Sequence, residues 1–203
     1  MSDIFVFKRI NFFFTKIATL TEEEKNKKKA HPHIVQKKTG SIMVKFFLKI
    51  LGELTNVTDL EPVDTPESPY EYTFQIECTK CRTIHDKDIH MNRFEQHEMS
   101  GSRGEASFVF RCKECKNEHS ASITRTNEKL VIGANRPATI LEIDARGLDF
   151  TKFIPDGKFQ ALGEETGTKF DEVDLEDGEW YDVDEKTNEE VSIVDVKWTI
   201  SRS

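Results

Sequence analysis

Residues 70–81 read YEYTFQIECTKC, and they join a strand pattern directly to a pair of cysteines. Apolar and polar residues alternate from Tyr70 to Ile76, which is the period of a half-buried β-strand. Cys78 continues the apolar phase, so its sulfur is expected on the side of the strand that faces the core. The pattern predicts a strand that places a thiol pair at the edge of the hydrophobic core.

A second stretch, residues 106–115, repeats this arrangement. It reads ASFVFRCKEC, in which apolar residues alternate into the second cysteine pair. The chain has no other cysteines, and 30 residues separate the two pairs. Two thiolates with two residues between them can lie on one turn and converge on one cation at about 2.3 Å. Two such turns complete a tetrahedron. We therefore predict one Zn²⁺ ion held by Cys78, Cys81, Cys112 and Cys115.

A redox-active dithiol is the alternative interpretation of a C-x-x-C pair. It needs one pair at the start of a helix, where the dipole lowers a thiol pKa, whereas here two pairs lie between expected strands. His85 and His119 follow the pairs at the same offset, and we expect them beside the ligands or on the surface. A catalytic zinc keeps one position open for water, and four cysteines close it. With no nucleophile elbow, phosphate loop or H-E-x-x-H motif in the sequence, we predict that the protein is not an enzyme.

Period-2 alternation continues along most of the chain and indicates an all-β fold. We expect irregular chain at residues 147–155 and one short helical turn within residues 91–99. Each cysteine pair then joins an incoming strand to an outgoing one, as in a zinc ribbon. The expected strands cover residues 43–50, 70–78, 106–110, 121–123, 130–132, 139–143 and 191–200.

Two segments resemble each other and suggest an internal repeat. Residues 47–62 (FLKILGELTNVTDLEP) align without gaps with residues 140–155 (ILEIDARGLDFTKFIP), at an offset of 93. Two strands that are each followed by a turn can also match this well by chance. If the repeat is real, the fold has two packed β-units of sandwich or barrel type. The first, residues 43–136, carries the zinc-ribbon-like double knuckle; the second, residues 137–203, packs on it and has no cysteine.

Charge divides the chain into two parts. Residues 1–42 carry nine Lys or Arg and four Asp or Glu, a balance of +5, whereas the rest has a balance of −13. We expect residues 1–42 to be a poorly ordered basic extension, in which no run reaches the ~20 apolar residues of a membrane span. The acidic remainder disfavours a nucleic acid and leaves a protein as the expected partner.

The acidic charge is concentrated near the end of the chain. Residues 171–190 contain eleven Asp or Glu against Lys186 alone. We expect a solvated loop and edge region here. The alternative is a docking surface for a basic partner, anchored by Trp180 and Tyr181.

Several of these stretches together resemble a known family. They are VKFFLKILGELTNVTDLEP (44–62), YTFQIECTKCRTIH (72–85), SFVFRCKECKNEHSASI (107–123), and the ending with Trp180-Tyr181 and Val191 to Ile200. They are similar to the eukaryotic CXXC-motif-containing zinc-binding proteins, and the resemblance covers about residues 43–203. It implies an all-β fold and one zinc ion held by the four cysteines. The resemblance does not by itself imply an enzyme, because the biochemical role of the family is poorly defined.

Our first hypothesis is a non-enzymatic binding or adaptor module with a structural zinc, either a monomer or a homodimer. Closely spaced thiol pairs belong to reducing compartments, so we expect the cytoplasm, or the nucleus as well. The second hypothesis is a metallochaperone-like protein that exchanges a thiophilic ion with a partner. A nucleic-acid-binding zinc ribbon comes third because of the acidic charge. The first two differ in lability, since a structural site retains zinc against a moderate chelator.

Overall fold

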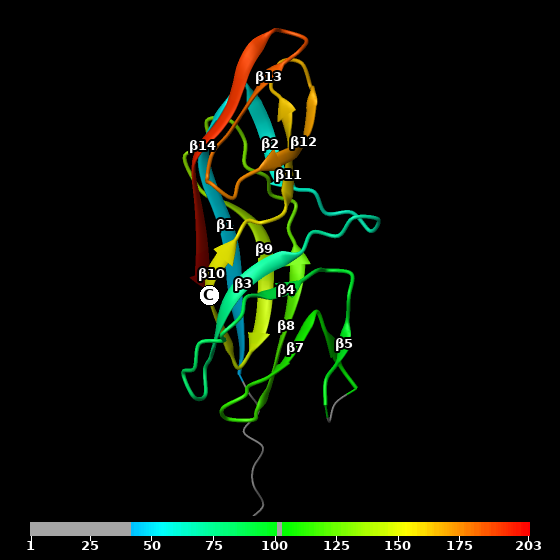
Figure 1. Ribbon diagram of the computed structural model, residues 1–203, viewed down its shortest axis with the longest axis vertical. Coiled ribbons are helices and arrows are strands. Elements are labelled where there is room, and N and C mark those ends of the chain that lie inside the picture. The colour runs from blue at the N-terminus through cyan, green and yellow to red at the C-terminus, as the bar shows by residue number, and fades with distance from the viewer. Residues whose placement is uncertain (1–41, 101–102) are drawn as a thin grey trace, which may run out of the picture. The chain divides into compact units, whose positions relative to one another are not determined.

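The computed structural model describes residues 42–100 and 103–203. The chain divides into two units, residues 1–39 and 40–203, and the described strands belong to the second. The expectation of a basic, poorly ordered extension therefore lies outside the described residues, Ile42 apart. The described residues form fourteen strands and no helix, which confirms the all-β prediction (Figure 1). Accordingly, this part of the chain contains no helix long and apolar enough to cross a membrane.

Six strands form the largest sheet, in the order β13-β14-β1-β9-β8-β7. Their bounds are β1 Met43–Thr55, β7 Phe108–Arg111, β8 Glu118–Arg125, β9 Ala138–Arg146, β13 Trp180–Asp184 and β14 Glu189–Arg202. Two three-stranded sheets have the orders β10-β3-β4 and β12-β11-β2. They consist of β2 Val57–Pro62, β3 Tyr72–Cys78, β4 Ile89–Met91, β10 Leu148–Ile154, β11 Lys158–Gly163 and β12 Lys169–Asp174. β5 (His97–Glu98) and β6 (Glu105–Ala106) pair as a short hairpin.

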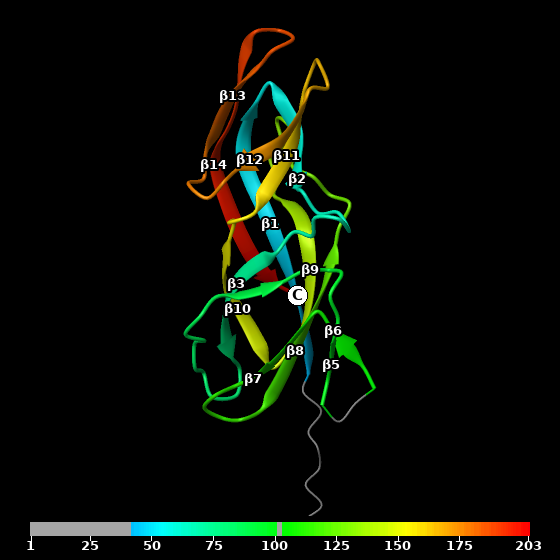
Figure 2. The same ribbon diagram turned by 45° about the vertical axis from the view of Figure 1, so that its right-hand side comes forward.

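Both small sheets pack on the same face of the large sheet (Figure 2). The ring of Phe46 in β1 lies 5.7 Å from the ring of Phe150 in β10. The ring of Trp198 in β14 lies 5.5 Å from that of Phe159 in β11. Because strands of both small sheets contact the large sheet, the buried side chains form one continuous core.

The connectivity repeats about the central β1–β9 pair. β14 lies next to β1 and β8 next to β9, and β13 and β7 follow at the two edges. After β1 the chain bends and β2 pairs with β11; after β9 it bends and β10 pairs with β3. The predicted internal repeat is therefore present in the topology, and strands from residues 43–136 and 137–203 share the same sheets. The corresponding strands are β1 and β9, β2 and β10, β3 and β11, β4 and β12, β7 and β13, and β8 and β14.

One segment is more regular than the sequence predicts. Residues 147–155, which we expect to be irregular, contain the strand β10, hydrogen-bonded to β3. The register shifts between Phe150 and Lys152, so one extra residue interrupts the alternation of buried and exposed side chains. This bulge hides the period-2 pattern.

Two further local predictions are wrong. Residues 91–99 hold no helical turn. The side-chain oxygen of Asn92 accepts hydrogen bonds from the N–H groups of Phe94 and Glu95, and these bonds fix a loop instead. The expected strand at residues 130–132 is reduced to a single bridge between Leu130 and Leu60.

Candidate metal centre

The first cysteine pair lies on the turn that follows β3. The N–H of Cys78 donates to the carbonyl of Thr83 at 2.9 Å, and the N–H of Arg82 donates to the carbonyl of Cys78 at 2.8 Å. Arg82 has a φ of 60°, in the left-handed region, which closes the turn. Cys78 and Cys81 thus leave the strand on one side of a tight turn.

The second cysteine pair lies on the turn between β7 and β8, with the same hydrogen bonds. The N–H of Cys112 donates to the carbonyl of Asn117 at 2.9 Å, and the N–H of Lys116 donates to the carbonyl of Cys112 at 3.0 Å. Lys116 has a φ of 59°. The two turns therefore have the same local geometry, although β3 belongs to a small sheet and β7–β8 to the large one.

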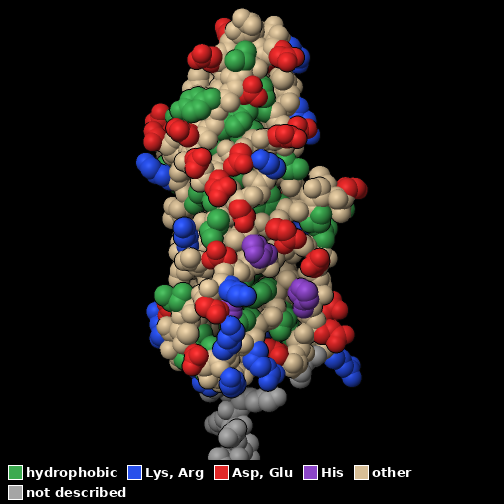
Figure 3. Space-filling view, in the orientation of Figure 1, with side chains coloured by type: hydrophobic (Ala, Val, Ile, Leu, Met, Phe, Trp, Pro, Cys, Tyr) green, Lys and Arg blue, Asp and Glu red, His purple; other side chains and the backbone are tan. Residues whose placement is uncertain are grey.

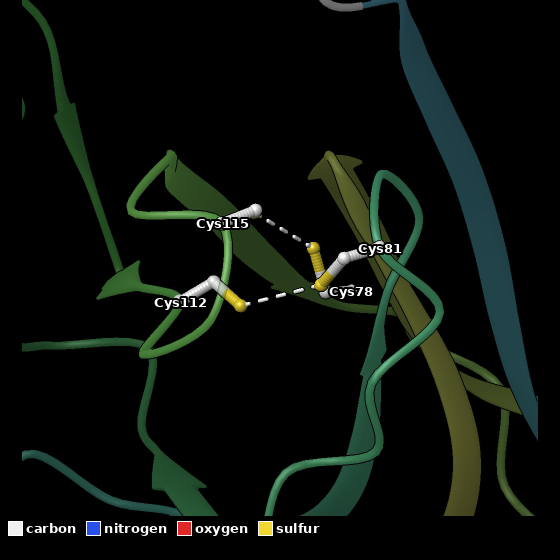
Figure 4. Close-up of side chains that lie close together, drawn as sticks. All are labelled: Cys78, Cys81, Cys112 and Cys115. Atoms are coloured by element: carbon white, nitrogen blue, oxygen red, sulfur yellow. Dashed lines mark hydrogen bonds between the residues drawn. The ribbon is translucent and has the colours of Figure 1, made fainter.

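The structure brings the four predicted cysteines together (Figure 4). All four sulfurs lie within 4.8 Å of one another, with Cys78 and Cys115 3.7 Å apart and Cys81 and Cys112 3.6 Å apart. Four thiolates on a tetrahedron with metal–sulfur bonds of 2.3 Å lie about 3.8 Å from each other. The donor set and its spacing therefore fit one zinc ion. Within residues 42–100 and 103–203, no other group of His, Cys, Asp or Glu has such spacing.

The four thiols differ in burial and in acidity before metal binds. Cys78 and Cys112 are buried, whereas Cys81 and Cys115 are partly exposed. Burial raises the pKa of Cys78 to about 12. The hydrogen bond between the hydroxyl of Thr83 and the sulfur of Cys81, 3.3 Å long, lowers the pKa of Cys81 to about 6. Hydrogen bonds from Asn117 lower the pKa of Cys115. The partly exposed Cys81 and Cys115 therefore lose a proton more readily than an ordinary thiol, whereas Cys78 releases its proton as the cation binds.

His119, at the start of β8, lies directly beside a ligand. Its ring is buried, and its Nε2 is 3.2 Å from the sulfur of Cys78. Burial, and secondarily the charge of Lys80, lower the pKa of His119, so the ring is neutral. A metal-bound thiolate only accepts hydrogen bonds, so Nε2–H is the donor. This bond reduces the charge on the sulfur and orients it.

Gly147, in the bend between β9 and β10, makes room for this ring. A Cβ atom at this position would lie 2.0 Å from Nδ1 of His119, and Gly147 has a φ of +78°. Its carbonyl accepts the N–H of Thr79 at 3.0 Å, within the first cysteine turn. Sequence reasoning did not single out this residue; a lone glycine inside a strand pattern is the available signal for a close approach.

His85 has a different position and does not join the four cysteines. Its Nδ1 is 2.7 Å from the carbonyl of Lys87, and its ring packs edge-on against Phe110 with 4.7 Å between centroids. Together with Ile84, these rings line a cavity of about 160 Å³ beside the inner cysteines. Cys78 and Cys112 are among the residues that line this cavity.

These features define a class: an all-β zinc-binding protein with a four-cysteine centre. Residues 47–201 match the family described as CXXC motif containing zinc binding protein, eukaryotic. The chain belongs to this family. The family and the convergence of the four cysteines together indicate one zinc ion per chain.

Relatives and solved structures agree with this membership. A UPF0587 protein of Schizosaccharomyces pombe is 39% identical over 161 residues, which is 79% of this chain and all of that protein. The CXXC motif containing zinc binding protein of Homo sapiens is 33% identical over 156 residues, 76% of this chain and 96% of its own length. The crystal structure of C1orf123 has a TM-score of 0.71 and 32% identity, covering 78% of this chain and 99% of that one. A hypothetical protein from Plasmodium falciparum shares the fold, with a TM-score of 0.68 and 22% identity.

Proposed function

We propose that this protein is a non-enzymatic protein-binding module in which zinc has a structural role. Four thiolates occupy every position of a tetrahedron and leave none for a substrate or a water nucleophile. The turns that carry them come from two different sheets, so a bound zinc ion cross-links those sheets. Both observations support a structural metal.

The observation that carries the binding role is the open edge of β13. Within the described strands, β13 is the last in its sheet and pairs with β14 alone. Tyr181 and Val183, two residues apart and hence on one face, are 63% and 44% exposed. Trp180, on the other face, packs against Phe170 with 5.4 Å between ring centroids. Tyr181 is therefore the accessible aromatic of this edge, and Trp180 belongs to the fold.

The charge around this edge selects the kind of partner. Asp and Glu side chains outnumber Lys and Arg over β11–β13 in Figure 3, whereas Lys and Arg gather at the end that carries the cysteine turns. An open edge offers backbone N–H and C=O groups to an incoming strand. In β13 the N–H of Val183 donates to Oδ1 of Asp182 at 2.7 Å, and an incoming carbonyl would replace this acceptor. Acidic side chains beside the edge favour a basic strand. The proposed partner is thus a protein with a basic, extended segment.

Two designed peptides test this proposal. Both alternate Val and Thr with charged residues, which are Lys in one peptide and Glu in the other. We expect only the Lys peptide to shift the amide resonances of β13, less so at high salt, and Tyr181→Ala to abolish the shift. Val131→Ala, an exposed apolar residue on another segment, is the matched control. Equal binding of both peptides, or unchanged binding to Tyr181→Ala, overturns the proposal.

The partial exposure of Cys81 and Cys115 favours a second candidate, metal exchange with a partner. Accessible thiolates of low pKa are the ones that an incoming ligand displaces first. The two candidates differ in the rate of zinc release to a moderate chelator. A structural site retains its zinc over hours, and release within seconds to minutes would support exchange.

A further inference from the structure

A turn in the second half of the chain has the backbone of the first cysteine turn. In the β11–β12 turn, the N–H of Gly163 donates to the carbonyl of Thr168 at 2.8 Å, and the N–H of Gly167 donates to the carbonyl of Gly163 at 2.9 Å. Gly167 has a φ of 61°. The bonds have the same spacing as those around Cys78, so Gly163 occupies its position and Thr166 that of Cys81.

The β13–β14 turn matches the second cysteine turn in the same way. The N–H of Asn188 donates to the carbonyl of Asp184 at 2.7 Å, and Asn188 has a φ of 60°. Asp184 thus corresponds to Cys112, and Thr187 corresponds to Cys115. β13 and β14 are the strands that the repeated topology equates with β7 and β8.

The match extends to the bends that support the turns. Thr79, which follows Cys78, donates its N–H to the carbonyl of Gly147 at 3.0 Å; Glu164, which follows Gly163, donates to the carbonyl of Asn56 at 3.0 Å. Gly147 and Asn56 are the positive-φ residues between β9 and β10 and between β1 and β2. The correspondence therefore rests on matching backbone hydrogen bonds in three places: the β11–β12 turn, the β13–β14 turn and the bend at Asn56.

A carboxylate lies at the centre of this second pair of turns. Asp184 is 3% exposed, and it accepts hydrogen bonds from the hydroxyl groups of Thr166 and Thr168, the latter at 2.9 Å, and from the N–H of Lys186 at 2.9 Å. A Cβ atom at Gly163 would lie 2.8 Å from Oδ2 of Asp184 and 2.5 Å from Oγ1 of Thr166. A side chain at position 163, which is equivalent to Cys78, would thus point into this centre. The carboxylate of Asp184 leaves space there only for the hydrogen atom of a glycine.

We propose that residues 163–168 and 184–188 form a metal-free copy of the zinc centre. In this copy the carboxylate of Asp184, held by two threonine hydroxyls, joins the two turns as a zinc ion joins the cysteine turns. The backbone of the copy is that of a zinc site, and only its side chains differ. Four cysteines at the equivalent positions therefore create a second zinc site.

The variant Gly163→Cys/Thr166→Cys/Asp184→Cys/Thr187→Cys tests this directly. Purified under reducing conditions, it is expected to contain two zinc ions per chain instead of one. Loading with Co²⁺ is expected to double the thiolate-to-metal absorption. The matched control is the triple variant Thr166→Cys/Asp184→Cys/Thr187→Cys, which retains Gly163. This triple variant should bind the second zinc ion more weakly. A folded quadruple variant with a single zinc ion overturns the proposal.

A second measurement on the native turns covers the case in which the quadruple variant does not fold. Thr166→Val/Thr168→Val keeps the side-chain shape and removes both hydroxyl donors to Asp184. We expect amide hydrogen exchange to accelerate together in residues 163–168 and 184–188, with zinc content and exchange at the cysteine turns unchanged. Acceleration confined to residues 163–168 would mean that Asp184 does not join the turns.

Discussion

The two pairs of turns make the same connection with different chemistry. One pair is joined by four thiolates and a zinc ion, the other by one carboxylate and its hydrogen-bond donors. Structural zinc contributes about 10–16 kcal/mol of apparent binding free energy, whereas a hydrogen bond to a charged group contributes about 1.5–3 kcal/mol. From this difference we expect the cysteine turns to depend on the supply of metal and the turns around Asp184 to be independent of it.

Loss of one thiolate is expected to have the largest effect. Cys112→Ser removes a buried ligand, so we expect loss of zinc and a fall in the free energy of unfolding of several kcal/mol, given the ~10–16 kcal/mol of structural zinc. Metal analysis and chemical denaturation measure both. The same substitution in metal-free protein should change little. A variant with full zinc content and an unchanged midpoint would contradict the four-thiolate centre.

Loss of the Asp184 carboxylate is the corresponding change in the metal-free pair of turns. Asp184→Ala removes the acceptor of the partly buried hydroxyl groups of Thr166 and Thr168, which lie 2.9 Å from each other. An unpaired buried donor costs about 1–3 kcal/mol, so these partly buried ones should cost about 1 kcal/mol each. We expect a lower denaturation midpoint with zinc still at one ion per chain. Asp182→Ala, an exposed acid on the same strand, is the control. Equal destabilisation by the two variants would show that Asp184 makes no special connection.

Substitutions at two glycines compare the surroundings of the two pairs of turns. Gly147→Ala places a methyl group against His119, so we expect a loss of about 1–3 kcal/mol from overpacking, and 10–100-fold weaker zinc binding as the ring moves away from Cys78. Gly167→Ala meets no atom within 4 Å and has only the cost of its positive φ, about 1 kcal/mol. Competition with a chelator should separate them. Equal zinc affinity in both would remove the role assigned to Gly147.

Removal of the histidine alone has a smaller effect. His119→Leu deletes the N–H donor to Cys78, and we expect zinc binding to weaken about tenfold, or about 1.4 kcal/mol. The free energy of unfolding of the zinc-loaded protein should fall by the same amount, about 1.4 kcal/mol, which is less than the loss expected for Cys112→Ser. His85→Leu, whose ring lies outside the group of four, should leave zinc affinity unaltered. The two variants are compared by competition against the same chelator.

The smallest expected effect is a dependence on acid. The hydroxyl of Thr166, foremost, holds the pKa of Asp184 below its ordinary value, with help from the N–H of Lys186. Its contribution is therefore complete above the unfolded pKa of about 3.9, and it is lost as pH falls through the lower folded value. Denaturation of wild type and Asp184→Asn should show a stability difference that shrinks below about pH 4. A constant difference would contradict this.

The strands and the cysteine cluster could be predicted because their signals are local. Alternation from Tyr70 to Ile76 fixes β3 and its buried face, and a two-residue gap between cysteines fixes the geometry of a turn. The number and spacing of the cysteines predicted the zinc ion, and the family resemblance implied the same metal. The topology could not be predicted in this way, because the pairing of β2 with β11 and of β10 with β3 joins residues 70 to 106 positions apart.

The second pair of turns escaped prediction for a different reason. Its backbone repeats that of the cysteine turns, but Gly163 and Asp184 share no residue type with Cys78 and Cys112. The gapless offset of 93 between the halves also misplaces the bends, since Asn56 and Gly147 are 91 positions apart. The same backbone hydrogen bonds can thus form in turns with unrelated side chains, and only the structure reveals them.

The reciprocal pairing of β2 with β11 and of β10 with β3 gives the chain an internal pseudo-two-fold symmetry. Its two halves are arranged like the subunits of a two-fold dimer and are linked through residues 126–137. In such a dimer both partners use the same surface, and each gives a strand to the other. Residues 43–136 alone would leave β1, β2 and β3 without their neighbours from the other half. We expect halves separated at this linker to behave as complementing fragments, because each needs the other, or a second copy of itself, to complete its sheets.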